Sequence, residues 1–502
     1  MLNLCKRFGA IAALSVIMLL AACGYGGGGD MVSGPIVQSA TLFGGQVTPS
    51  VLTSASGTST VTVDMNSGML SGSVVVSGIT ATGVTLNVGG VGSNGNVAAT
   101  LVEQTPGSGT WTFPAGAALS ADQVTTFRNG GIYANVATNL YPSGQIRGQY
   151  GLDVRTANLT STQVTPPVVS AGSGNAILGI NTVGLALSGA VTIGGLAATA
   201  VTINDGALGA NGAVLVSLTE TPAGSGIWVV PGGTVLSSAQ LTSFQNGALY
   251  VNATSAANTA GALRGQVGRI VLDALMTSAQ EVPGSASSAQ ATARAVIDPI
   301  TRVLNGTFVT NGITATLAHI HTGAFGVASG VTYPFSQTTA GGNTWTMTQT
   351  TMTPTQYQTM LFGGNYANVH SAAFPAGEIR AQLGNIVRTG ILTGAGEVPP
   401  NNSTAIGRIR VDINPATLDV TVNLATTGVT GTVAHIHQGS PGVVAGVAIP
   451  FTQVSSGVWA AAAPAKATLA QATAFAAGGT YANVHSAAFP VGEIRVQLTG
   501  TD

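Results

Sequence analysis

The chain has 502 residues, only 6% of which are charged, and a formal net charge of -1. Ordinary soluble proteins carry roughly a quarter charged residues, so hydroxyl and amide side chains must cover most of this surface. The few Lys and Arg residues are scattered rather than clustered, which excludes nucleic acid as an expected partner. A chain of this length is expected to form several domains.

The N-terminus has the pattern of an export signal. Lys6 and Arg7 precede an apolar run from Phe8 to Leu20, which is too short to span a bilayer and ends in small residues. The phrase LAAC that follows resembles a bacterial lipobox. This resemblance implies that Cys23 becomes the lipid-bearing first residue of the mature chain. An ordinary signal peptide with an incidental cysteine is the alternative interpretation.

We therefore predict a lipoprotein signal peptide over residues 1–22 and a flexible, Gly-rich tether over residues 23–35. No later segment has the pattern of a transmembrane helix, so the lipid would be the anchor in the bilayer. After cleavage the mature chain keeps one cysteine and can form no internal disulfide. The expected location is the bacterial cell envelope, at the outer membrane or the cell surface.

The rest of the chain is an internal repeat. The phrase GQIRGQY recurs as GALRGQV, GEIRAQL and GEIRVQL at intervals of about 115 residues. A tyrosine phrase precedes each of these phrases, and one tryptophan stands further upstream in each copy. This pattern predicts four tandem copies of one domain. Their expected bounds are residues 36–150, 151–268, 269–384 and 385–502.

Each copy is predicted to be an all-β domain, either an antiparallel β-sandwich or a barrel. Short runs rich in Val, Ile and Thr, such as STVTVDM, alternate with turn residues. The helix candidates are single turns in LSADQVTTFRNGG and MTPTQYQTMLFGG, with Ser or Thr caps. We expect the tryptophans to lie in the cores, and glycan stacking is the less favoured interpretation. The junctions have no linker, which predicts copies packed in a stiff row.

All the histidines of the chain lie in the third and fourth copies. The six are His319, His321, His370, His435, His437 and His485. Two copies of His-Ile-His supply four of them, and two copies of YANVHSAAFP supply the others. Alternate residues of a strand share a face, so each His-Ile-His should project its two imidazoles together. A hairpin should then bring the third imidazole and a glutamate, Glu378 or Glu493, to the same place.

The first two copies lack this set of residues. Aligned on the tyrosine phrase and the glycines, the histidine positions become Leu86, Val88 and Ala137 in the first copy and Thr202, Asn204 and Thr254 in the second. The glutamate of GEIR becomes Gln145 and Ala262. The glutamates of the EVP phrases, Glu281 and Glu397, become Gln46 and Gln163. This joint loss indicates that the histidines and glutamates form one functional unit.

One arginine persists in all four copies, as Arg147, Arg264, Arg380 and Arg495. Because it remains where the histidines are lost, we expect it to support the fold through a buried, charge-assisted hydrogen bond.

The third and fourth copies resemble the CHRD domain, a module named for chordin and common in exported bacterial proteins. The resemblance lies in three phrases that occur in order, SAQEVPG, AHIHTG and YANVHSAAFPAGEIRAQL in the third copy, with close equivalents in the fourth. The first two copies resemble the family only through their tyrosine and arginine phrases. The resemblance implies an extracytoplasmic all-β module without an established catalytic role. It does not imply growth-factor binding, which is credited to other modules of chordin.

Three imidazoles from two strands match a three-histidine zinc or copper site. Glu378 and Glu493 would either complete the coordination or orient an imidazole. A hydrogen-bonded structural cluster and a pH-sensing cluster are the alternatives.

Two functions follow from these interpretations. The first is a non-catalytic, lipid-anchored binding, adhesion or spacer protein with a surface protein or a glycan as its partner, in which the first two copies act as spacers. The second is a copper- or zinc-dependent redox enzyme that resembles superoxide dismutase, although the further ligands and the disulfide of that enzyme are not found in the sequence. No nucleophile elbow or phosphate-binding loop supports another chemistry.

Overall fold

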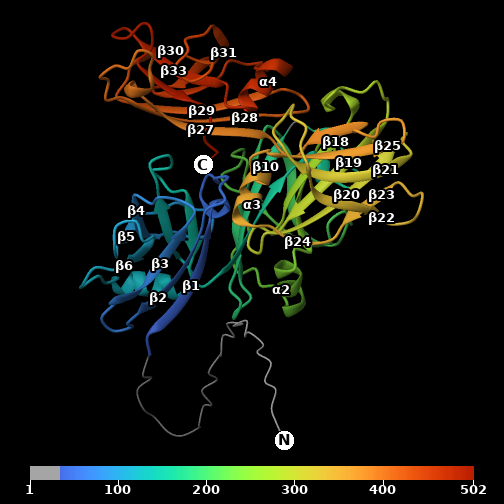
Figure 1. Cartoon of the computed structure of the whole chain (residues 1–502). Coiled ribbons are helices and arrows are strands. Elements are labelled where there is room, and N and C mark those ends of the chain that lie inside the picture. Colours follow the sequence, from blue (N-terminus) through green and yellow to red (C-terminus); the bar gives the residue numbers. More distant parts are fainter. Residues whose placement is uncertain (1–33, 171, 502) are drawn as a thin grey trace, which may run out of the picture.

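A computed structural model of the chain describes residues 34–170 and 172–501, which form four successive antiparallel β-domains (Figure 1). The predicted all-β class, with four repeated domains, is therefore confirmed. The predicted signal peptide, Cys23 and residues 23–33 of the predicted tether lie outside the described residues. Within the described ranges, no helix has both the length and the apolar character needed to cross a membrane.

The first copy is a closed barrel with the strand order β1-β2-β3-β6-β5-β4-β7-β8. Residues of β2 alternate between buried and exposed or half-buried positions, because successive side chains of a strand point to opposite faces. Its elements are β1 (Ile36–Phe43), η1 (Gly44–Gln46), β2 (Ser56–Val63), β3 (Leu70–Ser77), β4 (Gly83–Val88), β5 (Val97–Glu103), β6 (Thr110–Thr112), α1 (Ala121–Arg128), β7 (Ile132–Ala137) and β8 (Ile146–Gln149).

The second copy divides the same plan into two sheets, with the orders β14-β15-β11-β10-β9 and β13-β12-β16-β17. A bridge between Thr160 and Arg264 joins the two sheets. The elements are β9 (Asp153–Leu159), η2 (Ser161–Gln163), β10 (Ser173–Ile180), β11 (Leu187–Gly194), β12 (Ala198–Asp205), β13 (Val214–Ser217), β14 (Thr219–Glu220), β15 (Ile227–Val229), α2 (Ser238–Gln245), β16 (Leu249–Ser255) and β17 (Leu263–Gln266).

The third copy is one sheet with the order β18-β19-β20-β23-β22-β21-β25-β26, and β24 pairs with β20. A bridge between Thr277 and Arg380 brings its two edges together. The elements are β18 (Ile270–Met276), η3 (Ser278–Gln280), β19 (Gln290–Ile297), β20 (Val303–Asn311), β21 (Ala315–Thr322), β22 (Val331–Gln337), β23 (Thr344–Met347), β24 (Thr350–Thr351), α3 (Pro354–Leu361), β25 (Asn365–Ser371) and β26 (Ile379–Gln382).

The fourth copy is again a closed barrel, with the order β27-β28-β29-β32-β31-β30-β33-β34. Its closing pair is Thr393 with Arg495, equivalent to Phe43 with Arg147 in the first copy. The elements are β27 (Ile386–Thr393), η4 (Gly394–Gly396), β28 (Ile406–Ile413), β29 (Val420–Thr427), β30 (Gly431–Gln438), β31 (Val447–Ser455), β32 (Val458–Ala461), α4 (Leu469–Ala476), β33 (Thr480–Ser486) and β34 (Ile494–Gln497).

Each copy has one helix of eight residues. The sequence correctly places α1 and α3 but predicts a single turn for each, whereas eight residues make about two turns. A capping box begins each helix. In α1, the Ser120 hydroxyl accepts a hydrogen bond from the Gln123 N–H, and the Gln123 side chain accepts one from the Ser120 N–H. Two orphan donors are satisfied in this way, which explains why such a short helix is stable.

The tryptophans lie in the cores, as predicted. Trp111, Trp228, Trp345 and Trp459 are between 3% and 8% exposed. Each belongs to the apolar cluster of its own copy. A ring that is buried in this way cannot stack on a glycan at the surface.

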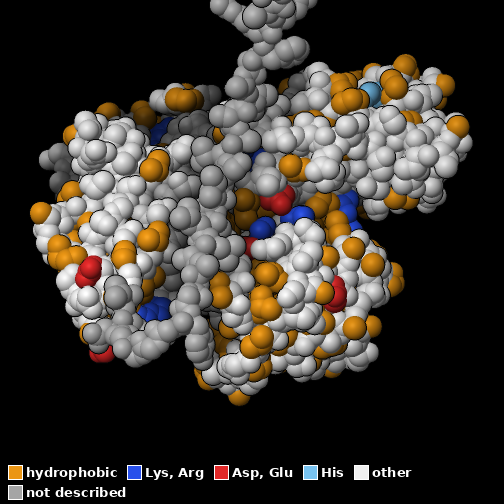
Figure 2. Space-filling model, turned by 90° about the horizontal axis from the view of Figure 1, so that it is seen from below, with side chains coloured by type: hydrophobic (Ala, Val, Ile, Leu, Met, Phe, Trp, Pro, Cys, Tyr) orange, Lys and Arg blue, Asp and Glu red, His pale blue; other side chains and the backbone are white. Residues whose placement is uncertain are grey.

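Contacts between the copies do not follow a simple row, so this expectation is wrong. The Arg408 Nε of the fourth copy donates to the Asn139 carbonyl of the first copy at 2.5 Å. A loop of the third copy inserts Phe325 into the core of the fourth. Figure 2 shows a face dominated by uncharged side chains, on which several of the few charged ones gather where the domains meet. Some of the sparse charged residues make contacts between copies, as when Arg294 donates to the Thr162 carbonyl.

Candidate metal centre

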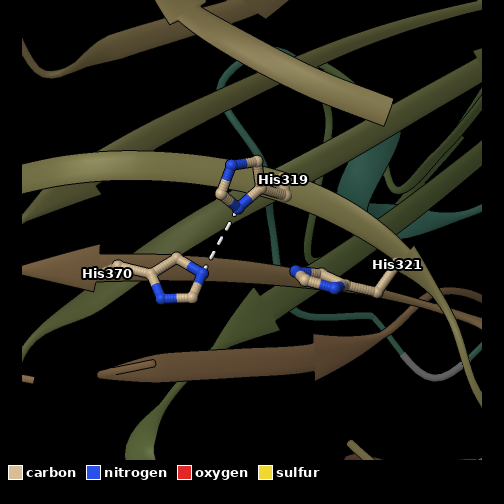
Figure 3. Close-up of side chains that lie close together, drawn as sticks. All are labelled: His319, His321 and His370. Carbon is tan, nitrogen blue, oxygen red and sulfur yellow. Dashed lines mark hydrogen bonds between the residues drawn. The ribbon is translucent and has the colours of Figure 1, made fainter. Parts of the chain in front are cut away.

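Two clusters of three imidazoles lie at equivalent places in the third and fourth copies. In the third copy, β21 supplies His319 and His321, and the adjacent antiparallel strand β25 supplies His370 (Figure 3). In the fourth copy, β30 and β33 supply the equivalent residues. Within each cluster, the three nitrogen atoms that could bind a metal lie within 4.8 Å of one another. Each cluster could therefore hold one metal ion.

The two clusters have nearly the same geometry. The His319 and His321 rings are perpendicular, with centroids 5.5 Å apart, and the equivalent pair in the fourth copy is also 5.5 Å apart. His319 Nδ1 lies 3.3 Å from His370 Nε2, as Figure 3 shows. The two copies differ in many surrounding residues, so this agreement indicates that the backbone plan of the domain fixes the arrangement.

Backbone carbonyls determine which nitrogen of each inner imidazole carries the proton. His321 Nδ1 lies 2.9 Å from the Ser329 carbonyl, and His370 Nδ1 lies 3.1 Å from the Pro375 carbonyl. The fourth copy repeats both contacts at 2.8 and 3.1 Å. A carbonyl oxygen can only accept, so Nδ1 is the donor. The Nε2 atoms keep their lone pairs and point toward the centre of the cluster.

Several of these nitrogen atoms have no hydrogen-bond partner although they are buried. They are His321 Nε2 in the third copy and His435 Nδ1 and His485 Nε2 in the fourth. A buried polar atom without a partner costs about 1–3 kcal/mol, so such atoms are rare in folded proteins. One metal ion bound in each cluster would satisfy these atoms.

The imidazoles are held in the neutral form that binds metals. Burial, with a contribution from the neighbouring imidazoles, lowers the pKa of His319 and of His435 to about 4. Burial also lowers the pKa of His321, His370 and His485. Protons therefore do not compete with a metal ion for these nitrogen atoms at neutral pH.

The constant arginine lies beside each cluster but supports the barrel. The Arg380 guanidinium stacks over the Tyr366 ring at 3.4 Å, and the same ring is parallel to the His321 imidazole. The first copy, which has no histidine, keeps this stacking between Arg147 and Tyr133 at 3.4 Å. In every copy the guanidinium donates to backbone carbonyls of the loop after the His-x-His strand. These contacts are those of a residue that stabilises the fold.

The glutamates of GEIR have hydroxyl partners rather than imidazole partners. Glu378 accepts hydrogen bonds from Ser287 Oγ at 2.6 Å and from Ser371 Oγ. Glu493 accepts one from Ser403 Oγ at 2.7 Å. Neither has a hydrogen bond to a histidine among the described residues, and their role toward a metal stays a prediction.

Pairing between strands corrects the alignment of the first copy. In every copy the strand tyrosine lies opposite the second histidine or its replacement. In the first copy that replacement is Asn87, and Thr85 occupies the position of the first histidine. The predicted positions Leu86 and Val88 are wrong by one residue, because Leu86 points into the core and is 0% exposed.

Both degenerate copies therefore replace His-x-His with Thr-x-Asn. The prediction of Thr202 and Asn204 for the second copy is confirmed by its pairing. Asn204 donates to the Gly212 carbonyl at 3.2 Å and Asn87 to the Gly95 carbonyl at 3.1 Å. These carbonyls are equivalent to those that accept from the inner histidines, so the asparagine preserves the hydrogen bond and removes the metal-binding nitrogen.

The alignment of the EVP glutamates also needs a correction. Three glutamines accept a hydrogen bond from the same backbone N–H of the arginine strand, namely Gln46, Gln163 and Gln280. Glu281 and Glu397 follow this position, so their equivalents are Val47 and Val164 rather than Gln46 and Gln163. Burial raises the pKa of both glutamates. Sequence reasoning noted their loss together with the histidines but did not place them near the cluster.

The fold and the two clusters define a class of protein, a tandem array of antiparallel β-barrels in which some domains carry a three-histidine centre. The sequence model of the CHRD domain matches residues 38–150, 155–267, 272–383 and 389–498, so the chain belongs to the CHRD family. All four copies are matched, including the first two, for which the sequence alone showed only a partial resemblance. No curated protein matches the chain at a significant level.

Proposed function

We propose that this protein binds zinc or copper at two three-histidine centres and acts as a non-catalytic binding or adhesion module of the bacterial cell envelope. The observation that carries the proposal is the state of the imidazoles. Their outer nitrogen atoms donate to backbone carbonyls, while inner nitrogen atoms such as His321 Nε2 are buried without a partner. Histidines that bind a metal through one ring nitrogen typically donate from the other nitrogen to a carbonyl of this kind.

The same observation argues against the two other interpretations of the clusters. His319 Nδ1 does lie within hydrogen-bond distance of His370 Nε2. A purely structural cluster would nevertheless leave no buried nitrogen without a partner, because unpaired polar atoms destabilise the fold, whereas His321 Nε2, His435 Nδ1 and His485 Nε2 have none. A pH sensor for mildly acidic conditions needs imidazoles with a pKa near 6, whereas burial holds the pKa of His319 and His435 at about 4. Three neutral imidazoles are instead a donor set that suits zinc and copper.

The export signal and the lipobox support a place in the cell envelope. Cys23 would carry the lipid, and the glycine-rich segment after it would connect the four domains to the outer membrane or the cell surface. The first two copies would act as spacers between the membrane and the two centres. A surface protein or a glycan is the expected partner of the array, and tandem domains favour weak, repeated contacts.

A copper-dependent redox activity is the second candidate, since three imidazoles are also a donor set of redox-active copper. Redox turnover by the copper-loaded protein would favour this candidate over a binding role.

Elemental analysis of the chain without residues 1–23 tests the proposal. The protein should be exported through the periplasm without a His tag and compared with a H321A/H437A variant. We expect about two equivalents of zinc or copper, one per cluster, in the parent and none in the variant. A parent protein that holds no metal after loading with either ion would overturn the proposal, and the histidines would then have a structural role.

A further inference from the structure

A buried glutamate lies behind each histidine cluster without touching an imidazole. Glu281 and Glu397 are 7% and 6% exposed and directly follow the turns η3 and η4. In each carboxyl group one oxygen is buried without a hydrogen-bond partner, Oε2 of Glu281 and Oε1 of Glu397. Arg380 and Arg495 stabilise the charged forms of Glu281 and Glu397 only in part, because burial still raises the pKa of both. A further positive charge nearby would stabilise both carboxylates.

An asparagine contacts each glutamate, and in the fourth copy it also contacts the histidine cluster. Asn368 Nδ2 donates to Glu281 Oε1 at 3.3 Å, and the Asn368 Oδ1 atom is buried without a partner. In the fourth copy the equivalent oxygen, Asn483 Oδ1, lies 3.0 Å from His437 Nε2. The proton of that imidazole is already on Nδ1, which faces the Ala445 carbonyl. Two acceptor atoms that face each other repel, and a cation bound between them would remove this repulsion.

The first two copies show what the asparagine does without the glutamate. They keep the residue as Asn135 and Asn252, but valine replaces the glutamate. Each amide then donates to a backbone carbonyl of its own hairpin, Ser143 or Ala260, at 3.1 Å. The amide direction thus changes with the glutamate, and the glutamate occurs only where the histidines occur.

We propose that Glu281 and Glu397 are positioning residues for the two metal centres. Each fixes an asparagine with its oxygen toward the imidazoles and supplies the negative charge that a divalent cation requires in a buried site. The inference rests on the proposed metal binding and deepens it. It assigns the carboxylate of each centre to the EVP phrase rather than to Glu378 or Glu493, whose oxygens accept hydrogen bonds from serines.

A single E281V variant tests this inference within one molecule, because the fourth copy is an internal reference. Valine is the residue that the first two copies carry at this position. In a zinc titration we expect one equivalent to bind about 10- to 100-fold more weakly while the other is unchanged. E281Q keeps an acceptor for Asn368 but loses the charge, so we expect a smaller loss of about tenfold. The matched control is E378Q, for which both equivalents should bind as in the parent.

The melting temperature without metal distinguishes a positioning role from a structural one. A structural glutamate would lower the melting temperature when it is replaced, with or without metal. We expect E281V to melt at or above the temperature of the metal-free parent, since it removes a buried carboxyl group that its neighbours compensate only in part, and to lose part of the rise that zinc causes in the parent.

The experiment distinguishes a failure of this inference from a failure of the proposed function. Equal affinity of both equivalents in E281V, or an equal loss in E378Q, would overturn this inference and leave the metal centres in place. A parent that binds no metal would overturn the proposed function and this inference with it.

Discussion

The two halves of the chain share one barrel and differ in a small set of polar residues. The first two copies and the last two share the capped helix, the buried tryptophan and the stacking of arginine on tyrosine. Only the last two carry the imidazoles and the EVP glutamate. The difference shows that the barrel does not need the histidine cluster, because the first copy closes into the same strand order without it. The clusters are therefore additions to the domain and candidates for function.

The replacement residues explain how a copy can lose its cluster without losing its fold. Thr-x-Asn retains the hydrogen bond to the loop carbonyl, and Thr85 also donates to Asn87 Oδ1 at 2.7 Å. A degenerate copy thus satisfies its polar atoms internally. An intact copy leaves imidazole nitrogen atoms unpaired, which costs stability until a ligand binds.

The largest effect is expected from grafting the histidine cluster into the first copy. The variant T85H/N87H/A137H/V47E transfers the full set to equivalent positions. We expect a third equivalent of zinc, bound with at least micromolar affinity, or about 8 kcal/mol of binding free energy. Elemental analysis and titration would measure it. The matched control L86H/V88H/A137H uses the positions that the sequence alone suggested, and it should add no site because position 86 lies in the core.

Acid should destabilise the last two copies more than the first two, and this effect is smaller than that of the graft. The pKa of His319 and His435 falls from 6.5 to about 4 on folding. The unfolded chain therefore binds protons first, and the stability from these groups is fully present above pH 6.5 and is lost as the pH falls from 6.5 toward 4. The raised pKa of Glu281 and Glu397 acts in the opposite direction, but five lowered imidazoles outnumber them. We expect the metal-free third and fourth copies to destabilise between pH 7 and 5, while the first two do not.

Hydrogen exchange of the whole chain in a chelator would measure this difference peptide by peptide. Equal loss of protection in all four copies would contradict the assignment of acid sensitivity to the imidazoles. Added zinc should restore the last two copies at pH 7 and much less at pH 5, because protons then compete for the ligands.

Much of this organisation could be predicted from the sequence, and the misses have physical reasons. Repeats, alternation of apolar residues and the spacing of His-x-His predict the barrels and the convergence of three imidazoles, because strand periodicity is a local property. The predicted register of the first copy is wrong by one residue. Apolar and polar residues are mixed around Leu86 and Val88, so their alternation alone does not show which residues face the core. The register also shifts between Leu86 and Asn87 in the first copy and between Ile320 and His321 in the third, so strand partners cannot be found by counting residues alone.

Contacts through a third residue could not be predicted. Glu281 is far from the histidines in sequence, and its partner Asn368 lies on the strand that carries His370, opposite His319. Proximity in a hairpin instead favoured Glu378, whose carboxylate is already satisfied by two serines. A predicted hairpin shows which residues are near each other, but not which of them form a hydrogen bond. The equivalence of Glu281 and Val47 follows from the glutamine before each, Gln280 and Gln46, which accepts a hydrogen bond from the same backbone N–H of the arginine strand.

The smallest expected effect on stability comes from the reverse exchange, H319T/H321N in the third copy. This variant installs the pair that the second copy carries as Thr202 and Asn204, so the new asparagine should donate to the Ser329 carbonyl in place of the imidazole. We expect the metal-free unfolding free energy to change by less than about 1 kcal/mol, while one equivalent of metal is lost. Urea unfolding followed by Trp fluorescence would measure the first quantity and titration the second. A large loss of stability with metal binding retained would show that the histidines serve the barrel, and that the two halves differ in how they fold rather than in what they bind.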